Sequence, residues 1–189
     1  MKAKIKNIIT ESMKAKEGLL KNELANIEKA ARVMIDSLRT GGKLLVFGNG
    51  GSAADSQHMA AELVGRFEKE RKALGAIALT TNTSVLTAIA NDYGYDVTFS
   101  RQIEALAKPR DVAFGISTSG NSKNVIDAVK KSKAMGLKTV GLAGNDGGRL
   151  KRECDICIVV GSNQTPRIQE SHLTICHILC QLIEEELFK

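Results

Sequence analysis

The sequence predicts an α/β fold in which a parallel sheet carries helices on both faces. Short apolar runs recur along the chain, and segments with helical periodicity separate most of them. Strands that alternate with helices pair in parallel through right-handed crossovers. The runs are continuously apolar, which is typical of strands buried on both sides. The five predicted strands are Leu44–Phe47, Leu74–Leu79, Val112–Ile116, Thr139–Leu142 and Ile156–Val160.

The helices surround these strands in a regular order. Apolar residues recur at helical spacing through residues 1–40, which predicts two helices with a break near Lys21 and Asn22 and an end at Gly41 and Gly42. These two helices form an N-terminal extension before the first strand. Further helices are predicted over residues 53–67, 84–91, 98–107, 122–134 and about 166–188.

Length and composition favour a single domain over residues 1–189. The two prolines stand far apart and no linker is visible. Aromatic residues make up 4% of the chain and tryptophan is absent, which argues against an aromatic platform for single-stranded nucleic acid. No secretory signal opens the chain, so we expect a cytoplasmic protein. We expect four reduced, buried thiols, at Cys154, Cys157, Cys176 and Cys180.

The net charge of +6 allows two interpretations. Lysines gather within residues 2–21 and 123–138. Solvated helix faces explain them most simply, while attraction for phosphorylated metabolites or for nucleic acid is the functional alternative. Charge alone does not separate these two anions.

The first predicted strand ends in Gly48-Asn49-Gly50-Gly51-Ser52. Glycines let a ligand approach the backbone, and Ser52 is expected to cap the next helix. No Gly-Lys-Ser/Thr follows, and position 53 is Ala, so the turn is neither a Walker loop nor a GxGxxG fingerprint. Ligands of open parallel sheets bind at this end of the strands, which makes the turn a candidate binding loop.

The third predicted strand runs into Ser117-Thr118-Ser119-Gly120-Asn121-Ser122, after which a helix begins. A helix start offers free N–H groups and a positive dipole end. One hydroxyl is enough for capping, and this loop has four, so we expect it to bind a phosphate group. The loops at Thr80–Ser84 with Asn91-Asp92, and at Gly144–Gly148, suit a polyhydroxylated sugar or are plain turns.

Two helices hold all three histidines. His58 and Glu62 are four residues apart and share one helix face, as an exposed pair or as two ligands of one metal. The last helix is expected to start at Thr165 as N-cap and Pro166 as first helical residue. It carries Gln169, His172 and His177, of which solvent exposure explains His172 more easily than His177.

Together these motifs resemble the sugar isomerase (SIS) family over nearly the whole chain. They are "GNGGSAADSQHMAAELVGRF", "AIANDYG", "GISTSGNSKNVI", "DGG" and "TPRIQESHLTICHIL". The resemblance implies a five-stranded parallel sheet in a flavodoxin-like, three-layer arrangement, with the helices of residues 1–40 packing in an oligomer. It further implies a homotetramer with active sites between subunits. The implied activity is aldose–ketose isomerisation of sedoheptulose 7-phosphate, the first step toward the heptose of bacterial surface polysaccharides such as lipopolysaccharide.

The resemblance also assigns roles to residues of this chain. It implies Glu62 as general base and His177 as acid, and zinc, one ion per subunit, as cofactor. The implied metal ligands are His58, Glu62, Gln169 and His177. The implied phosphate contacts are Ser117, Thr118, Ser119 and Ser122. The implied sugar contacts are Asn49, Gly50, Gly51, Ser52, Asn91 and Asp92, together with Glu62 and Gln169.

Spacing along the last helix adds one geometric expectation. Gln169 and His177 are eight residues apart, which separates their Cα atoms by roughly 12 Å along the axis and about 80° around it. Helical side chains lean toward the N-terminus, so Gln169 points away from His177. We therefore expect Gln169 and His177 of one metal site to come from different subunits.

Three alternatives remain from the sequence. A non-catalytic SIS relative binds the bacterial replication initiator. By its family pattern, that branch lacks the equivalents of Glu62 and His177 and carries Arg at the position of Ser119, whereas this chain keeps all three residues. An isomerase of another sugar phosphate, such as arabinose 5-phosphate, usually carries extra regulatory domains. A nucleic-acid binder agrees with the basic charge alone.

Overall fold

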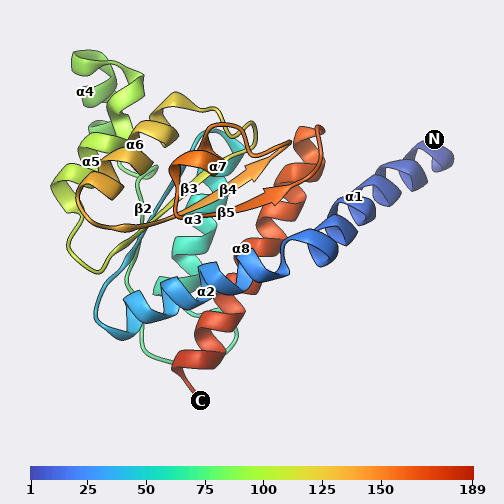
Figure 1. Cartoon of the computed structure of the whole chain (residues 1–189), viewed down its shortest axis with the longest axis horizontal. Helices are drawn as coiled ribbons and strands as arrows, with labels where there is room; N and C mark the ends of the chain where they lie inside the picture. Colours follow the sequence, from blue (N-terminus) through green and yellow to red (C-terminus); the bar gives the residue numbers. More distant parts are fainter.

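The computed structural model describes all 189 residues and forms one three-layer α/β domain (Figure 1). Five parallel strands make a single sheet in the order β2-β1-β3-β4-β5. The strands are β1 (Leu44–Gly48), β2 (Ala76–Ala78), β3 (Val112–Ser117), β4 (Lys138–Gly144) and β5 (Ile156–Val160). The predicted fold class is therefore confirmed.

The helices cover both faces of this sheet (Figure 1). They are α1 (Lys2–Asn22), α2 (Leu24–Arg39), α3 (Gly51–Val64), α4 (Thr83–Tyr93), α5 (Thr98–Leu106), α6 (Lys123–Ala134), α7 (Leu150–Glu153) and α8 (Thr165–Leu187), with a 3-10 turn at Tyr95–Val97. The N-terminal extension is present as expected, with Glu23 between α1 and α2. Helix α1 projects away from the domain (Figure 1).

Alternation along the strands divides the core in two. Leu44 and Val46 point to the face covered by α2, α3 and α8, while Leu45 and Phe47 point to the face covered by α5 and α6. All five residues of β1 are buried, as the continuous apolar run predicts. The sheet is thus sandwiched, and only the ends of its strands are free to hold a ligand.

Two elements differ from the sequence prediction. Strand β2 has three residues in place of six, because it lies at the sheet edge and pairs with β1 alone. Helix α7 was not predicted, since four residues are too few to show helical periodicity. None of the helices has the length and apolarity needed to cross a bilayer.

Candidate active site

The first binding loop joins β1 to α3 at the carboxyl end of the sheet. Gly50 has a φ of 55° and precedes the helix, which begins at Gly51 without a side-chain cap. The expected cap by Ser52 is wrong: Ser52 is buried within the first turn. A Cβ at Gly51 would overlap the Nε2 atom of Gln169, so glycine here lets the start of α8 approach the start of α3.

Asn49 of this loop is held by a network that the sequence did not indicate. Its Nδ2 donates to Oδ1 of Asn124 at 2.8 Å, and Nδ2 of Asn124 donates back to Oδ1 of Asn49 at 2.9 Å. The hydroxyl of Tyr95 donates to the same Oδ1 at 3.0 Å. The loop after β1 is therefore tied to the start of α6. The only sequence signal for this pair was Asn124, an Asn in the first turn of the amphipathic helix α6.

The second binding loop follows β3 and is also internally bonded. The hydroxyl of Ser117 donates to that of Ser122 at 2.9 Å, and the hydroxyl of Ser119 accepts from the backbone N–H of Asn121 at 3.1 Å. Gly120 has a φ of 65°, and a Cβ there would overlap the carbonyl oxygen of Gly147 in the loop after β4. Ser117, Thr118, Ser119 and Ser122 thus gather at the start of α6, as the phosphate hypothesis requires.

The remaining predicted sugar contacts lie on α4. Asn91 and Asp92 are exposed near its C-terminal end, where Nδ2 of Asn91 donates to Oδ1 of Asp92 at 2.8 Å. Tyr95, three residues after Asp92, reaches the first binding loop. Helix α4 has no buried residue, so its own side chains do not fix it tightly to the domain.

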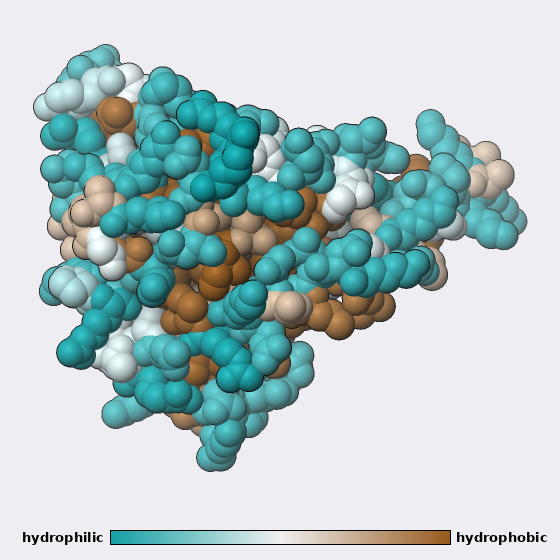
Figure 2. All heavy atoms as spheres, in the orientation of Figure 1, coloured by the Kyte–Doolittle hydropathy of each residue, from teal (hydrophilic) through white to brown (hydrophobic).

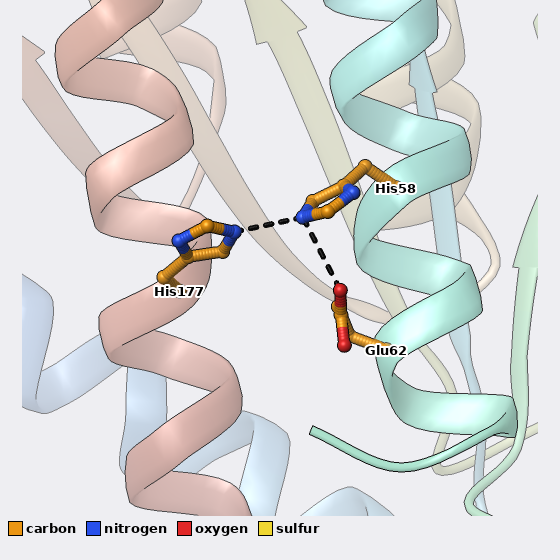
Figure 3. Close-up of side chains that lie close together, drawn as sticks. All are labelled: His58, Glu62 and His177. Atoms are coloured by element: carbon orange, nitrogen blue, oxygen red, sulfur yellow. Dashed lines mark hydrogen bonds and ion pairs between the residues drawn. The ribbon is translucent and has the colours of Figure 1, made fainter. Parts of the chain in front are cut away.

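His58, Glu62 and His177 form a second cluster, between α3 and α8 (Figure 3). Nε2 of His58 lies 2.7 Å from Nε2 of His177 and 3.4 Å from Oε1 of Glu62. One potential ligand atom from each residue lies within 4.8 Å of the other two. Two imidazoles and a carboxylate are a donor set that suits zinc. The structure therefore brings together three of the four implied metal ligands.

Gln169 does not join this cluster. Its amide lies against Gly51, at the opposite end of α3 from Glu62. Gly51 and Glu62 are eleven residues apart, which corresponds to about 16 Å along a helix. The chain therefore presents two groups of candidate residues, one at the strand ends with Gln169 and one between α3 and α8.

The expected exposure of His172 is wrong, while His177 is only partly exposed, as expected. His172 is fully buried, and its Nε2–H donates to the carbonyl oxygen of Ala143 at 3.2 Å, while Nδ1 has no partner. His177 is half-buried and faces the cluster. Burial lowers the pKa of His172 to about 4, although its hydrogen bond to Ala143 acts in the opposite direction.

Asp55 is a further acidic group that sequence reasoning missed. It precedes His58 by three residues on the same face of α3, and its Oδ2 is buried without a partner. Burial raises the pKa of Asp55 to about 6, and nearby His58 lowers it. The i, i+3 spacing to His58 was the available signal.

The lysines and cysteines have ordinary structural surroundings. The lysines of α6 pair with local carboxylates, for example Lys123 with Asp127 at 2.8 Å and Lys130 with Glu153 at 3.3 Å. At α6 this supports a solvated helix face over an anion-binding surface. Cys154, Cys176 and Cys180 are buried as expected, and Cys157 is half-buried.

Comparison with known proteins shows the family of the chain and its similar relatives within that family. The profile of the SIS domain matches residues 9–144, so the chain belongs to the SIS domain family. Its similar relatives within that family are phosphoheptose isomerases. That of Aliarcobacter butzleri is 58% identical over 161 residues, 85% of each chain, and that of Geotalea daltonii is 54% identical over 184 residues, 97% of this chain and 96% of the relative. The structure of phosphoheptose isomerase from Neisseria gonorrhoeae has a TM-score of 0.92 at 43% identity and covers 97% of this chain and 98% of its own.

Proposed function

We propose that the protein isomerises sedoheptulose 7-phosphate to glycero-manno-heptose 7-phosphate, which supplies the heptose of surface polysaccharides. The observation that carries this proposal is the cluster of His58, Glu62 and His177, which supplies a carboxylate beside two imidazoles. The names of the relatives and the phosphate loop at the start of α6 support the substrate class. The N–H groups and hydroxyls of that loop would hold the phosphate in the positive field of the helix end.

Glu62 is the proposed base. The reaction moves a carbonyl between C2 and C1, so a proton must leave the carbon next to the carbonyl and return to the neighbouring carbon. One carboxylate can remove the proton and deliver it to the adjacent carbon, passing through an enediolate. His177 faces Glu62 across the cluster and is the proposed acid, which gives a proton to the carbonyl oxygen and takes one back when the new carbonyl forms.

Zinc is the proposed cofactor, and the donor set fits it. His58, Glu62 and His177 would hold the ion, with Gln169 as the implied fourth ligand. Bound there, zinc supplies Lewis acidity that stabilises negative charge on the substrate oxygens. Glu62 cannot bind the ion tightly and act as a base at the same moment, so we propose that it has one role at a time.

We also propose that each active site is completed by a second copy of the chain in a homotetramer. Gly51, at the end of the loop after β1, and Glu62 lie about 16 Å apart along α3. At about 1.2 Å per bond, as in extended backbone, a seven-carbon chain spans roughly 10 Å from C1 to phosphorus. One substrate therefore fits better between the loops of one copy and the cluster of another.

Helix α1 supplies a surface for this assembly. Its residues Ile5, Ile8, Ile9, Met13 and Leu20 are 44–66% exposed. Figure 2 shows apolar side chains along this projecting helix. A row of exposed apolar side chains on one helix is typical of an interaction surface. The position of Gln169 against Gly51, away from His177, supports the proposal that Gln169 and His177 of one site come from different subunits.

The other functions have less support. Glu62 and His177 are present and adjacent, as catalysis requires and a non-catalytic binder does not. The relatives at 54–58% identity are phosphoheptose isomerases, which disfavours arabinose 5-phosphate as substrate. The local ion pairs of the α6 lysines disfavour nucleic acid at that helix.

The first experiment is an isomerisation assay with sedoheptulose 7-phosphate, in the presence of zinc, on the native chain and on Glu62→Gln. Glu70→Gln is the matched control, because Glu70 is 93% exposed. We expect turnover by the native chain and the control, and a loss of about 10³-fold in kcat for Glu62→Gln. Absence of turnover by the native chain would refute the proposed substrate.

Mixed oligomers test the shared site. Glu62→Gln is mixed in equal amounts with the double variant Ser117→Ala/Ser119→Ala, after unfolding and joint refolding. Sites built from two copies would regain about a quarter of native activity, because a quarter of random pairs combine two intact halves. Sites built from one copy would regain none.

A further inference from the structure

Arg71 and Glu184 form a buried ion pair behind the His58–Glu62–His177 cluster. Nε of Arg71 lies 2.9 Å from Oε2 of Glu184, and the two side chains are 1% and 3% exposed. Arg71 belongs to the segment between α3 and β2, and Glu184 belongs to α8. The pair therefore links the same two helices that carry the cluster.

The carboxylate of Glu184 organises the backbone that follows α3. It accepts from the N–H groups of Phe67 at 3.1 Å, Glu68 at 2.8 Å and Lys69 at 2.6 Å. Burial alone would raise its pKa, but these N–H groups and Arg71 together hold the pKa of Glu184 at about 2. The carboxylate thus stays ionised and keeps three consecutive amides in place.

The guanidinium of Arg71 holds the end of α3 itself. It donates to the carbonyl oxygen of Glu62 at 2.9 Å, to that of Leu63 at 2.8 Å and to that of Gly65 at 3.2 Å. The last carbonyls of a helix have no partner within the helix, and a cation at this end also complements the dipole. One of the residues held in this way is the proposed base.

The same segment touches the proposed acid. The ring of Phe67 lies 5.6 Å from the imidazole of His177, centroid to centroid. The N–H of Phe67 is one of the three that Glu184 binds. Glu184 therefore acts on His177 through Phe67, while Arg71 acts on Glu62 through its backbone.

We propose that Arg71 and Glu184 are positioning residues that fix Glu62 and His177 relative to each other. This inference rests on the proposed function of the cluster. Stability alone explains the pair poorly, since buried ion pairs are often replaced by apolar residues without loss of stability. What apolar residues could not supply is the set of hydrogen bonds directed at the backbone of Glu62 and Phe67.

Conservative variants test the proposal. Glu184→Gln keeps the shape but weakens the carboxylate's bonds, and Arg71→Lys keeps the charge but loses the fork that spans the helix end. We expect kcat to fall 10- to 100-fold with KM changed less than threefold, because an active-site displacement of about 1 Å can cost 10²-fold in rate. Glu185→Gln and Arg32→Lys, the same changes at exposed positions of α8 and α2, should keep native kcat.

The assay is run well below the unfolding temperature of each variant, with circular dichroism and sedimentation confirming native fold and assembly. A variant affected only in stability would then keep native kcat. Native kcat in correctly folded Glu184→Gln and Arg71→Lys would overturn the proposal.

A second measurement does not depend on activity. The chain has three histidines, so the ring-proton signals of His177 can be assigned by NMR with His177→Gln. The nearby Phe67 ring shifts those signals, and we expect this shift to shrink in Glu184→Gln but not in Glu185→Gln. If the native chain does not turn over the sugar phosphate, the proposed function fails and the NMR shift alone decides. An unmoved His177 signal in Glu184→Gln would overturn the positioning role.

Discussion

The strand-end loops and the His58–Glu62–His177 cluster are built in different ways. The loops are short stretches of consecutive residues with glycines at two close approaches. Local hydrogen bonds such as Ser117 to Ser122 hold the loop after β3, whereas Asn124 and Tyr95 hold Asn49 in the loop after β1. The cluster joins residues from α3 and α8, separated by most of the chain, and depends on how two helices pack. The loop after β3, which is proposed to bind phosphate, is thus largely shaped by its own backbone, while the proposed catalytic groups depend on how α3 and α8 pack.

The difference also appears in the chemistry of the two regions. The loop after β3 presents hydroxyls and amides that do not titrate near neutral pH. The surroundings of the cluster include Asp55 and Glu184, whose pKa values are both shifted. We therefore expect backbone changes to damage the loops most, and changes of charge or pH to damage the cluster most.

The largest effect is expected from Gly120→Ala. Alanine at this position would have to keep a backbone φ of 65°, and its methyl group would overlap Gly147. We therefore expect a loss of about 3 kcal/mol or more of unfolding free energy. Gly136→Ala is the control, because its φ of 80° is similar but nothing lies near its Cβ position. Urea unfolding should show a loss of about 1 kcal/mol for the control. Equal losses in the two variants would show that the close contact between Gly120 and Gly147 contributes nothing to the unfolding free energy.

Acid should weaken the cluster region next. The pKa of Glu184 is about 2 in the folded chain, below its ordinary value of 4.5, so its contribution is complete above pH 4.5 and is lost as pH falls through 2. The loss amounts to about 3 kcal/mol at most. In Glu184→Gln this dependence should vanish in urea titrations between pH 4.5 and 2.

His172 and Asp55 act at higher pH and oppose each other. The lowered pKa of His172 removes stability as pH falls from 6.5 to about 4, while the raised pKa of Asp55 adds stability as pH falls from about 6 to 3.8. The slope attributable to Glu184 is therefore clearest below pH 4. A Glu184→Gln variant with the native slope there would contradict the assignment.

Metal affinity should separate the two histidines of α8. His177→Gln removes a proposed ligand, and we expect zinc affinity to fall by more than the roughly 10- to 100-fold cost of losing a residue that only orients a ligand, measured by competition with a chromophoric chelator. His172→Gln should lower stability and leave zinc affinity unchanged, because His172 bonds to Ala143 and lies outside the cluster. Equal affinities of both variants would contradict the proposed site.

The smallest effect is expected from Tyr95→Phe. Its hydroxyl donates to Asn49 from an exposed position, so its loss should raise KM for the sugar phosphate two- to fivefold, equivalent to about 0.5–1 kcal/mol. Tyr93→Phe is the control, since Tyr93 is equally exposed and stacks on Arg101. An unchanged KM in Tyr95→Phe would show that the reciprocal pair of Asn49 and Asn124 holds the loop without it.

Local patterns predicted most of the fold. The strands at β1, β3, β4 and β5 and the paired N-terminal helices follow from apolar runs and helical periodicity. The edge strand β2 was overestimated because Leu74 bonds to Leu63 of α3 in place of β1, and Leu79 makes one bond to Val46 as the strand ends. The caps predicted at Ser52 and Thr165 each lie just inside the helix, after N-caps at Gly50 and Gln164. The sequence predicted which segments are helices and strands better than it predicted the residues at which they begin and end.

The candidate site shows the same division. The hydroxyl loop and the pairing of His58 with Glu62 could be predicted, since both are local. The exposure of His172 was predicted wrongly, because the rotation of α8 against the sheet depends on packing with β4 and α3. The Asn49–Asn124 pair and the Arg71–Glu184 pair join distant segments, so no local pattern announces them.

The strand order has a consequence for how the chain reaches its native state. Strands β1 and β3 are neighbours in the sheet, and Leu44 of β1 pairs with Val112 of β3. The segment between them in the chain forms α3, β2, α4 and α5. Parallel pairing across such separations makes folding slow, on the order of milliseconds to seconds, since loop closure precedes the contacts that reward it. During synthesis, β1 can complete its pairing only after β3 has been made, and the His58–Glu62–His177 cluster can form only after α8, which follows β5 in the chain, has been made.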